Sequence, residues 1–460
     1  MKMHILGIAG AGMAGVAELA LEKGYNISGT DLNINEVVRF IESEGATVFS
    51  NHSADNIAED VNVVVKSGAV KDNNEEIIEA ENERIPVWNR MYALYRLISD
   101  SENIISVVGS CGKTSMVAIL EYIFSREDPT VYMGAKSELT HRYGKIGNGK
   151  YALCECCEYK GSFYDFQGDY AVLTSVLRNH EDYYGSDIVT TIKAFNNFFE
   201  LSGVKRVYMP CELKKYFSTY SNNYEIVTVG YNDGDYQYCD VEYMGLKSAF
   251  KLKKSDKDYG LFTTSLFGSQ YIGELALGIA LAIDLGLDVD VVRENISSIC
   301  LPSRRMQVKY NSDKYLLIND NARIPSQIDV TLNAIKESFP DVLLICILGI
   351  WGRLNARPVD ELSQVLTQAD AVFFSPLGDC AISRGGAELD NVVTLIKEKM
   401  RCSQTSVYDD IKPEQILKVL GKFNIEYPTR KKVVITLGYD KYNEDFCNIL
   451  NMIEGLEEYK

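Results

Sequence analysis

A short run bracketed by glycines and ending in lysine and threonine is the clearest chemical signal in the chain. It reads Gly109-Ser110-Cys111-Gly112-Lys113-Thr114-Ser115, between an apolar run at 104–108 and another at 116–120. Glycine torsions turn backbone N–H groups toward an anion, and a helix beginning at Lys113 adds its positive end. Lys113 can reach terminal phosphates, and the Thr114 hydroxyl can hold Mg²⁺. The sequence therefore predicts a phosphate-binding loop, with an ordinary strand-to-helix turn as the competing interpretation.

A second glycine turn lies near the start of the chain. An apolar run at 3–8 leads into Gly10-Ala11-Gly12-Met13, and a second predicted strand at 26–31 ends in the acid Asp31. A glycine turn between strand and helix, with an acid about twenty residues further on, is typical of dinucleotide or nucleotide binding. A third predicted strand ends in the small-residue turn at Ser67. We predict that these residues bind a nucleotide or diphosphate, and a purely structural turn is the alternative.

Two further predicted strands lead from apolar residues into candidate metal ligands. Residues 151–155 are followed by Glu158, and residues 170–176 are followed by His180. Side chains at the carboxyl ends of parallel strands gather at one edge of the sheet, where α/β proteins bind ligands. The sequence thus predicts that Glu158 and His180 hold a metal. Each taken alone also fits a surface carboxylate or a loop histidine.

Three cysteines close together, Cys154, Cys156 and Cys157, suggest a metal site at first sight. They fall in a strand pattern, and no second Cys or His pair lies beside them, so we predict core packing instead. The chain has 11 cysteines, an odd number with scattered spacing. With no signal peptide expected before the first strand, we expect reduced thiols and a cytoplasmic protein.

The length and the net charge of the chain limit the classes of protein to which it can belong. A chain of 460 residues is too long to fold around a single hydrophobic core. At about 150 residues per domain, this length predicts about three domains. The net charge of −17 argues against a general nucleic-acid or anionic-membrane binder. No apolar run reaches the ~18 residues that span a bilayer, so we expect no membrane insertion.

Alternating strand and helix patterns predict an α/β protein of three domains. We expect a Rossmann-like N-terminal domain at 1–101, a central P-loop ATPase-type α/β domain at 102–300 and a C-terminal Rossmann-like α/β domain at 301–460. Residues 243–266 alternate as in an antiparallel excursion, residues 273–287 form an apolar helix, and 301–305 resemble a linker.

These motifs, in this order, resemble those of the Mur ligase family over essentially the whole chain. Besides both glycine turns, the likeness rests on residues 28–32, 65–69, 84–87, 128–130, 155–163 and 180–183. The resemblance implies an ATP-dependent ligase that joins a UDP-linked sugar or amino-acid precursor, through its carboxylate, to a free amino acid by way of an acyl phosphate. It implies ATP and Mg²⁺ as cofactors, and a monomer or homodimer.

The resemblance also assigns roles to individual residues. Lys113 would neutralise the β- and γ-phosphates, Thr114 and Glu158 would hold one Mg²⁺, and His180 would hold a second. Family members often carry a carbamylated lysine after that histidine. Lys193 is near that position, although a solvated helix lysine is the simpler interpretation.

In the third domain the match is looser. Arg305, Asp320 and Arg323 correspond to nucleotide-binding positions, with Asp320 as a ribose partner and Arg323 as a phosphate contact. Tyr271 and Glu274 replace asparagines near the base, which leaves base recognition open. The loop at 349–358 carries Arg353 and Arg357, predicted to bind the acceptor or a phosphate, and it resembles the loop of ligases that add later residues. The acceptor, and a murein or pseudomurein type of donor, stay open.

Two other function classes stay possible from the sequence. One is a non-catalytic nucleotide-binding partner, suggested by the altered base pocket. The other is a nicotinamide-dependent dehydrogenase that uses the first glycine turn, which leaves the loop at Lys113 unexplained.

Overall fold

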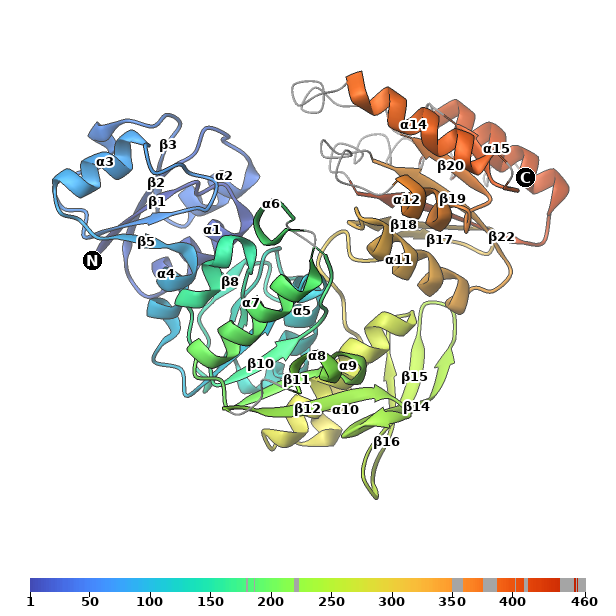
Figure 1. The fold of residues 1–460 in the computed structure, drawn as a ribbon, viewed down its shortest axis with the longest axis horizontal. Helices are drawn as coiled ribbons and strands as arrows, with labels where there is room; N and C mark the ends of the chain where they lie inside the picture. Colours follow the sequence, from blue (N-terminus) through green and yellow to red (C-terminus); the bar gives the residue numbers. More distant parts are fainter. Residues whose placement is uncertain are drawn as a thin grey trace. The chain divides into compact units, whose positions relative to one another are not determined.

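A computed structural model describes residues 1–178, 181–185, 187–218, 223–349, 359–374, 387–401, 403–408, 413–438, 451 and 453. The chain forms two compact units (Figure 1). Unit 1 comprises Met1–Glu242, Lys247–Leu266 and Tyr271–Ser303, and unit 2 comprises Tyr243–Leu246, Phe267–Gln270 and Arg304–Lys460. The predicted linker spans the change from unit 1 to unit 2 at Arg304, whereas the predicted domain limits stay predictions.

The first sheet of unit 1 is parallel, in the order β3-β2-β1-β4-β5. Its strands are β1 (Lys2–Leu6), β2 (Asn26–Thr30), β3 (Thr47–Phe49), β4 (Val63–Lys66) and β5 (Val87–Asn89), and its helices are α1 (Ala11–Glu22), α2 (Glu36–Ser43), α3 (Glu75–Asn82) and α4 (Arg90–Ile98). Because β1 pairs with both β2 and β4, the strand order reverses there. The first glycine turn therefore follows the strand at the topological switch point, where open α/β sheets bind ligands.

The second sheet carries the phosphate loop on its central strand. β6 (Asn103–Val108) pairs in parallel with β9 (Tyr151–Glu155) on one side and β10 (Tyr170–Leu173) on the other. After β6 comes α5 (Lys113–Ile123), so the predicted strand–turn–helix is confirmed. The neighbours are β7 (Thr130–Tyr132) and β8 (Gly144–Lys145) beyond β9, and β11 (Arg206–Pro210) and β12 (Glu225–Tyr231) beyond β10. The helices α6 (Glu181–Tyr184), α7 (Ile188–Leu201), α8 (Lys214–Phe217), α9 (Ser269–Asp284) and α10 (Val289–Ile296) complete this part.

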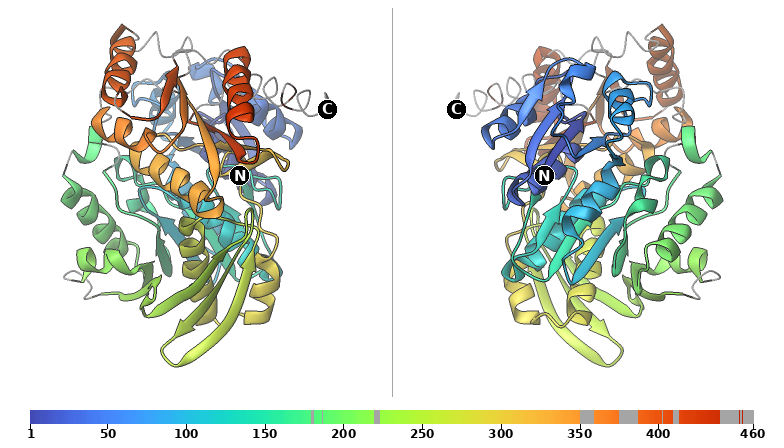
Figure 2. Two further views of the ribbon diagram at one scale, coloured as in Figure 1. Left: turned by 90° about the vertical axis from the view of Figure 1, so that its right-hand side faces the viewer. Right: turned by 90° about the vertical axis from the view of Figure 1, so that its left-hand side faces the viewer.

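The predicted antiparallel excursion is confirmed at the end of the second sheet. Here β13 (Asp233–Gly234) and β14 (Tyr236–Tyr243) precede β15 (Ser248–Lys254) and β16 (Lys257–Thr264). The last two strands pair antiparallel and form a long hairpin (Figure 2). Its alternating polar and apolar residues suit a sheet with one solvated face.

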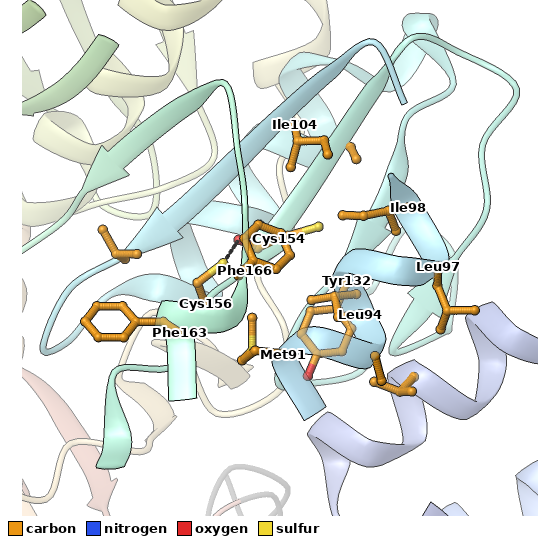
Figure 3. Close-up of a cluster of buried hydrophobic side chains, with 14 of the residues drawn as sticks. Met91, Leu94, Leu97, Ile98, Ile104, Tyr132, Cys154, Cys156, Phe163 and Phe166 are labelled. Atoms are coloured by element: carbon orange, nitrogen blue, oxygen red, sulfur yellow. Dashed lines mark hydrogen bonds between the residues drawn. The ribbon is translucent and has the colours of Figure 1, made fainter. Parts of the chain in front are cut away.

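One hydrophobic core joins the first two sheets. Four side chains on α4 pack into the central sheet, namely Met91, Leu94, Leu97 and Ile98. They meet Tyr132, Cys154 and Cys156 around the central strands (Figure 3). Both cysteines are fully buried, so the prediction that they serve core packing is confirmed, whereas Cys157 is only half-buried. A shared core of this kind explains why both sheets belong to one compact unit.

Unit 2 is a six-stranded sheet in the order β17-β18-β22-β19-β20-β21. The strands are β17 (Gln307–Asn311), β18 (Tyr315–Asp320), β19 (Val342–Leu348), β20 (Ala371–Phe374), β21 (Ser406–Tyr408) and β22 (Lys431–Leu437), and the helices are α11 (Pro325–Ser338), α12 (Val359–Leu366), α14 (Ala387–Met400) and α15 (Pro413–Glu426). All pairings are parallel except that of β17 with β18. The predicted α/β fold is thus confirmed. Among the described helices, none is long and apolar enough to cross a membrane.

Candidate active site

The phosphate loop is held against the end of β10. Gly109 and Gly112 have φ values of +144° and +85°, which favour glycine. A Cβ on Gly109 would collide with Thr174 Oγ1. The backbone N–H of Ser110 donates to Ser175 O at 3.0 Å, and that of Cys111 donates to Ser175 Oγ at 2.9 Å. Two neighbouring strands thus fix the shape of the loop.

Lys113 lies inside this loop and pairs with a carboxylate. Its Nζ donates to Gly109 O at 2.5 Å and to Glu158 Oε2 at 2.7 Å. The Lys113 side chain is 12% exposed and that of Glu158 is 3% exposed. Burial lowers the pKa of Lys113, but attraction from Glu158, and then from Cys157 and Glu155, outweighs burial and raises it above its usual value. The ammonium is therefore charged at neutral pH.

Thr114 contacts a different carboxylate, one that the sequence analysis did not select. Its Oγ1 donates to Glu155 Oε2 at 2.8 Å, and the same oxygen accepts the backbone N–H of Gly134 at 2.8 Å. Glu155 is the last residue of β9, the strand beside β6. The structure thus brings two carboxylates from the end of β9 to the loop, with Glu155 on Thr114 and Glu158 on Lys113. The signal for Glu155 was its place at the end of an apolar strand.

His180 lies outside the described residues, so its predicted metal role stays a prediction. The helix α6 that follows it is described, and the Tyr184 hydroxyl at its end donates to the backbone oxygen of Glu158. Lys193 is exposed on α7.

The first glycine turn brings its predicted residues to one edge of the first sheet. Asp31 accepts the backbone N–H of Ala9 at 3.0 Å, so it shapes the turn from within. A Cβ on Gly7, whose φ is +78°, would lie 2.9 Å from Ser67 Cβ. Gly10 is the N-cap of α1 and provides no side-chain cap. The Met13 N–H donates to Gly10 O at 2.9 Å, so an anion at this helix start would bind the N–H groups of Ala11 and Gly12.

Two side chains that the sequence analysis did not select cover this turn. The Tyr132 hydroxyl donates to Gly12 O at 2.9 Å. A Cβ on Gly12 would collide with Arg90 Nη1 and would lie 3.1 Å from Tyr132 Oη. Arg90 is also hydrogen-bonded to the side chain of Cys157, next to Glu158. Arg90 therefore connects the first glycine turn with the segment that follows β9.

Glu274 is the predicted base-region residue that the structure brings to the loop. A Cβ on Gly112 would lie 2.7 Å from Glu274 Oε1, so this carboxylate faces the start of α5. Tyr271, one turn earlier on α9, is buried.

In unit 2 Asp320, the predicted ribose partner, is buried, and its carboxylate accepts hydrogen bonds from backbone N–H groups. It accepts the N–H groups of Met306 and Ala322, each at 2.8 Å. Burial raises the pKa of Asp320 above its usual value. These contacts hold the segment in which Arg304 and Met306 have φ values of +65° and +47°. The role of Asp320 as a ribose partner stays a prediction.

Three arginines gather at the carboxyl ends of β18 and β22. Arg304 and Arg323 both donate to Asn321 Oδ1, at 3.0 Å and 3.1 Å, and both donate to Gly438 O. Burial, then repulsion from Arg323 and Arg305, lowers the pKa of Arg304 to about 10. The sequence analysis selected Arg305 and Arg323 but not Arg304. Arg353 and Arg357 lie outside the described residues.

The fold and the site define an α/β protein with two glycine turns that each join a strand to a helix, and a lysine–carboxylate pair at the second. Residues 2–102 match the model of the Mur ligase family, catalytic domain. Over 354 residues the chain is 30% identical to a UDP-N-acetylmuramate–L-alanine ligase of Clostridium kluyveri, covering 75% of this chain and 76% of the relative.

Two solved structures share the fold. The UDP-N-acetylmuramate–alanine ligase of Thermotoga maritima is 22% identical with a TM-score of 0.78, over 99% of each chain. The MurF ligase of Thermotoga maritima in complex with ADP is 15% identical with a TM-score of 0.63, over 95% of this chain and 96% of the other. The chain belongs to the Mur ligase family, and it is an enzyme, a ligase of the Mur type.

Proposed function

We propose that this enzyme uses ATP to form an amide bond between a UDP-linked carboxylate precursor and an amino acid, in the cytoplasm. One observation carries the proposal. Lys113 and Thr114 of the phosphate loop meet Glu158 and Glu155, while the nearby Arg90 contacts the first glycine turn. A triphosphate site and a diphosphate-type site thus lie within one compact unit, as a transfer between two anionic substrates requires.

The triphosphate binds at the second glycine turn. Backbone N–H groups in the first turn of α5 donate to the phosphate oxygens, and Lys113 places a positive charge beside them. The nucleotide and phosphate roles that the family resemblance implies for Arg305 and Arg323 of unit 2 stay predictions. ATP is the donor in this proposal, consistent with the ADP complex of the MurF relative.

The residues at the end of β9 fit a magnesium ion. Mg²⁺ prefers hard oxygen ligands, and the Thr114 hydroxyl and the carboxylates of Glu155 and Glu158 supply them. Thr114 and Glu158 would hold the ion, and His180 would hold a second. When bound, the metal would neutralise phosphate charge during transfer.

The precursor binds at the first glycine turn. The uncapped start of α1, with Gly10, Ala11, Gly12 and Met13, suits its diphosphate. The UDP-N-acetylmuramate–L-alanine ligases to which the chain is similar act on such a precursor by their names.

The proposed reaction has two steps. A carboxylate oxygen of the precursor attacks the γ-phosphorus, and ADP leaves. The amine of the amino acid attacks the acyl phosphate carbon, loses a proton, and inorganic phosphate leaves. Lys113 favours the first step because it compensates the charge that builds on the transferred phosphate. The burial of Glu158 and Lys113 limits the access of water, which would otherwise hydrolyse the acyl phosphate.

The experiment is a phosphate-release assay with the full chain, ATP and Mg²⁺. UDP-N-acetylmuramate and UDP-linked glutamate are each combined with a panel of amino acids that includes L-alanine. Phosphate release that needs both an acid and an amino acid supports the proposal, and the active pair defines donor and acceptor. Lys113→Ala should lower turnover by about 10²–10³-fold.

Two results would contradict the proposal, and a third would define its donor. Nucleotide binding without turnover across the whole panel would favour a non-catalytic partner. Tight NADH binding with no ATP binding would favour a dehydrogenase. A pseudomurein-type precursor as the sole active donor would keep the ligase reaction and exclude the murein substrate.

A further inference from the structure

We propose that Arg90 binds an oxyanion of the UDP-linked precursor and so determines which precursors the enzyme accepts. The inference rests on the proposed function, because it names a residue of that same precursor site. It starts from a cation that the sequence analysis did not select.

A rigid helix presents Arg90 at the ligand edge of the first sheet. It is the first residue of α4, which follows directly after β5, and Asn89 caps this helix by accepting the Tyr92 N–H at 2.9 Å. The next turns of α4 are fixed in the shared core by Met91 and Leu94 (Figure 3). The guanidinium therefore projects from an anchored helix end and not from a loop.

The guanidinium lies over the first turn of α1. Arg90 Nη1 occupies space that a Cβ on Gly12 would need, and its Cζ would lie 3.1 Å from that Cβ. Gly12 is one residue inside a helix whose N-cap provides no side-chain acceptor. The Gly12 carbonyl accepts the Tyr132 hydroxyl at 2.9 Å. An anion at this helix start would meet N–H groups and a guanidinium together.

The other side of Arg90 faces the phosphate loop. It is hydrogen-bonded to Cys157 and lies in the field of Glu155, and both of these residues also act on Lys113. Among the residues that the structure describes, no carboxylate lies within 4.0 Å of the Arg90 guanidinium, whereas Lys113 pairs with Glu158 at 2.7 Å. Arg90 is thus a half-buried cation between two anion sites, with no direct ion pair in the described part of the chain.

Two parts of the precursor offer the oxyanion that this guanidinium would bind, the diphosphate and the carboxylate. Both accept two parallel N–H donors, which Arg supplies and Lys cannot. Three probes separate them. UDP has only the diphosphate, UDP-N-acetylglucosamine adds a neutral sugar, and UDP-N-acetylmuramate adds the carboxylate.

The experiment measures the binding of these probes, and of ADP, to the full chain by calorimetry. The variants are Arg90→Met, which keeps an unbranched side chain but removes the charge and the N–H donors, and Arg90→Lys. Arg96→Met is the matched control, because Arg96 is exposed on the same helix and contacts Tyr92 and Trp88. We expect Arg90→Met to weaken precursor binding at least tenfold and Arg90→Lys to restore only part of it. ADP affinity and the melting temperature should stay close to those of Arg96→Met.

The pattern across the probes locates the contact. An equal loss for all three assigns the diphosphate, and a loss for UDP-N-acetylmuramate alone assigns the carboxylate. Unchanged binding of all three to Arg90→Met, while the wild type binds them, would overturn the inference but not the proposed function. An equal loss of ADP affinity together with a lower melting temperature would make Arg90 a structural residue and overturn it as well. Failure of the wild type to bind any UDP-linked probe would overturn the proposed function itself.

Discussion

Lys113 Nζ lies 2.7 Å from Glu158 Oε2 in a pocket where both side chains are almost fully buried. The same lysine is expected to bind the β- and γ-phosphates, and the same carboxylate is expected to bind Mg²⁺. The two ligands are therefore coupled. Nucleotide must separate Lys113 from Glu158, and a metal that binds Glu158 makes this separation easier.

Glu158→Gln should consequently act in opposite directions with and without metal. Without Mg²⁺ the variant should bind ADP about tenfold more tightly, or about 1.4 kcal/mol, because Lys113 no longer pairs with an anion. With Mg²⁺ its turnover should fall by about 10²–10³-fold. Calorimetry in chelator and phosphate release in Mg²⁺ measure the two effects.

Glu127→Gln, an exposed change in the same unit, is the control for these measurements. Weaker ADP binding by Glu158→Gln in chelator would show that the ion pair does not compete with nucleotide.

Glu155→Ala should raise the Mg²⁺ concentration required for half-maximal turnover. Its Oε2 accepts both the Thr114 hydroxyl and the Gly134 N–H at 2.8 Å, so it orients the hydroxyl that is expected to hold the metal. We expect an increase of about 10–100-fold. Phosphate release titrated with Mg²⁺ measures it. Glu155→Gln keeps an acceptor oxygen, so its Mg²⁺ requirement should lie between those of the wild type and Glu155→Ala. An unchanged Mg²⁺ requirement in Glu155→Ala would exclude this role.

The local elements of the chain were predictable because their signals are local. Strand β9 begins and ends at the predicted residues, since its apolar run stops at the polar Glu155. The loop at Lys113 was predictable for the same reason, because glycine torsions, strand and helix all lie within one short stretch.

What could not be predicted depends on contacts between distant parts of the chain. Arg90 has the sequence surroundings of an ordinary amphipathic helix, and only the packing of α4 brings it to Gly12. Glu155 and Glu158 are both plausible acids at a strand end, and the sequence does not say which one meets Thr114. The shared core of the first two sheets could not be predicted either, because an apolar helix face does not indicate which sheet it packs against.

Stability in acid should depend on Glu76, which is fully buried at the start of α3. It accepts from Thr30 at 2.6 Å and Asn56 at 2.7 Å, and His52 lies 2.6 Å away. Burial alone would raise the pKa of Glu76. The hydrogen bonds from His4, Thr30, His52 and Asn56 outweigh burial and lower this pKa to about 2. Because the pKa of Glu76 is lower in the folded chain than in the unfolded chain, the ionised carboxylate stabilises the fold at pH values above about 4.5. This contribution is lost as the pH falls from about 4.5 to 2. It amounts to on the order of 3 kcal/mol.

Glu76→Gln should therefore be less stable than the wild type at pH 7, and the difference should shrink below pH 4.5. Thermal melts at several pH values measure it. A constant difference from pH 7 to pH 3 would mean that Glu76 does not titrate with folding.

Glu18 should produce the opposite pH dependence in a higher window. It is fully buried on α1, and its Oε2 accepts the N–H groups of Tyr143 at 2.7 Å and Gly144 at 2.6 Å. Burial raises its pKa to about 7, above its unfolded value of 4.5. The folded state thus holds an extra proton between these values, and stability falls as pH rises through this window.

Glu18→Gln cannot ionise, so it should lose less stability than the wild type between pH 5 and pH 8, by on the order of 3 kcal/mol. It should start lower at pH 5, because its amide nitrogen replaces Oε1, which has no hydrogen-bond partner among the described residues. Chemical denaturation at both pH values measures the difference, with the exposed Glu42→Gln as the control. Parallel pH dependence in Glu18→Gln and the wild type would show that this carboxyl does not take up a proton on folding.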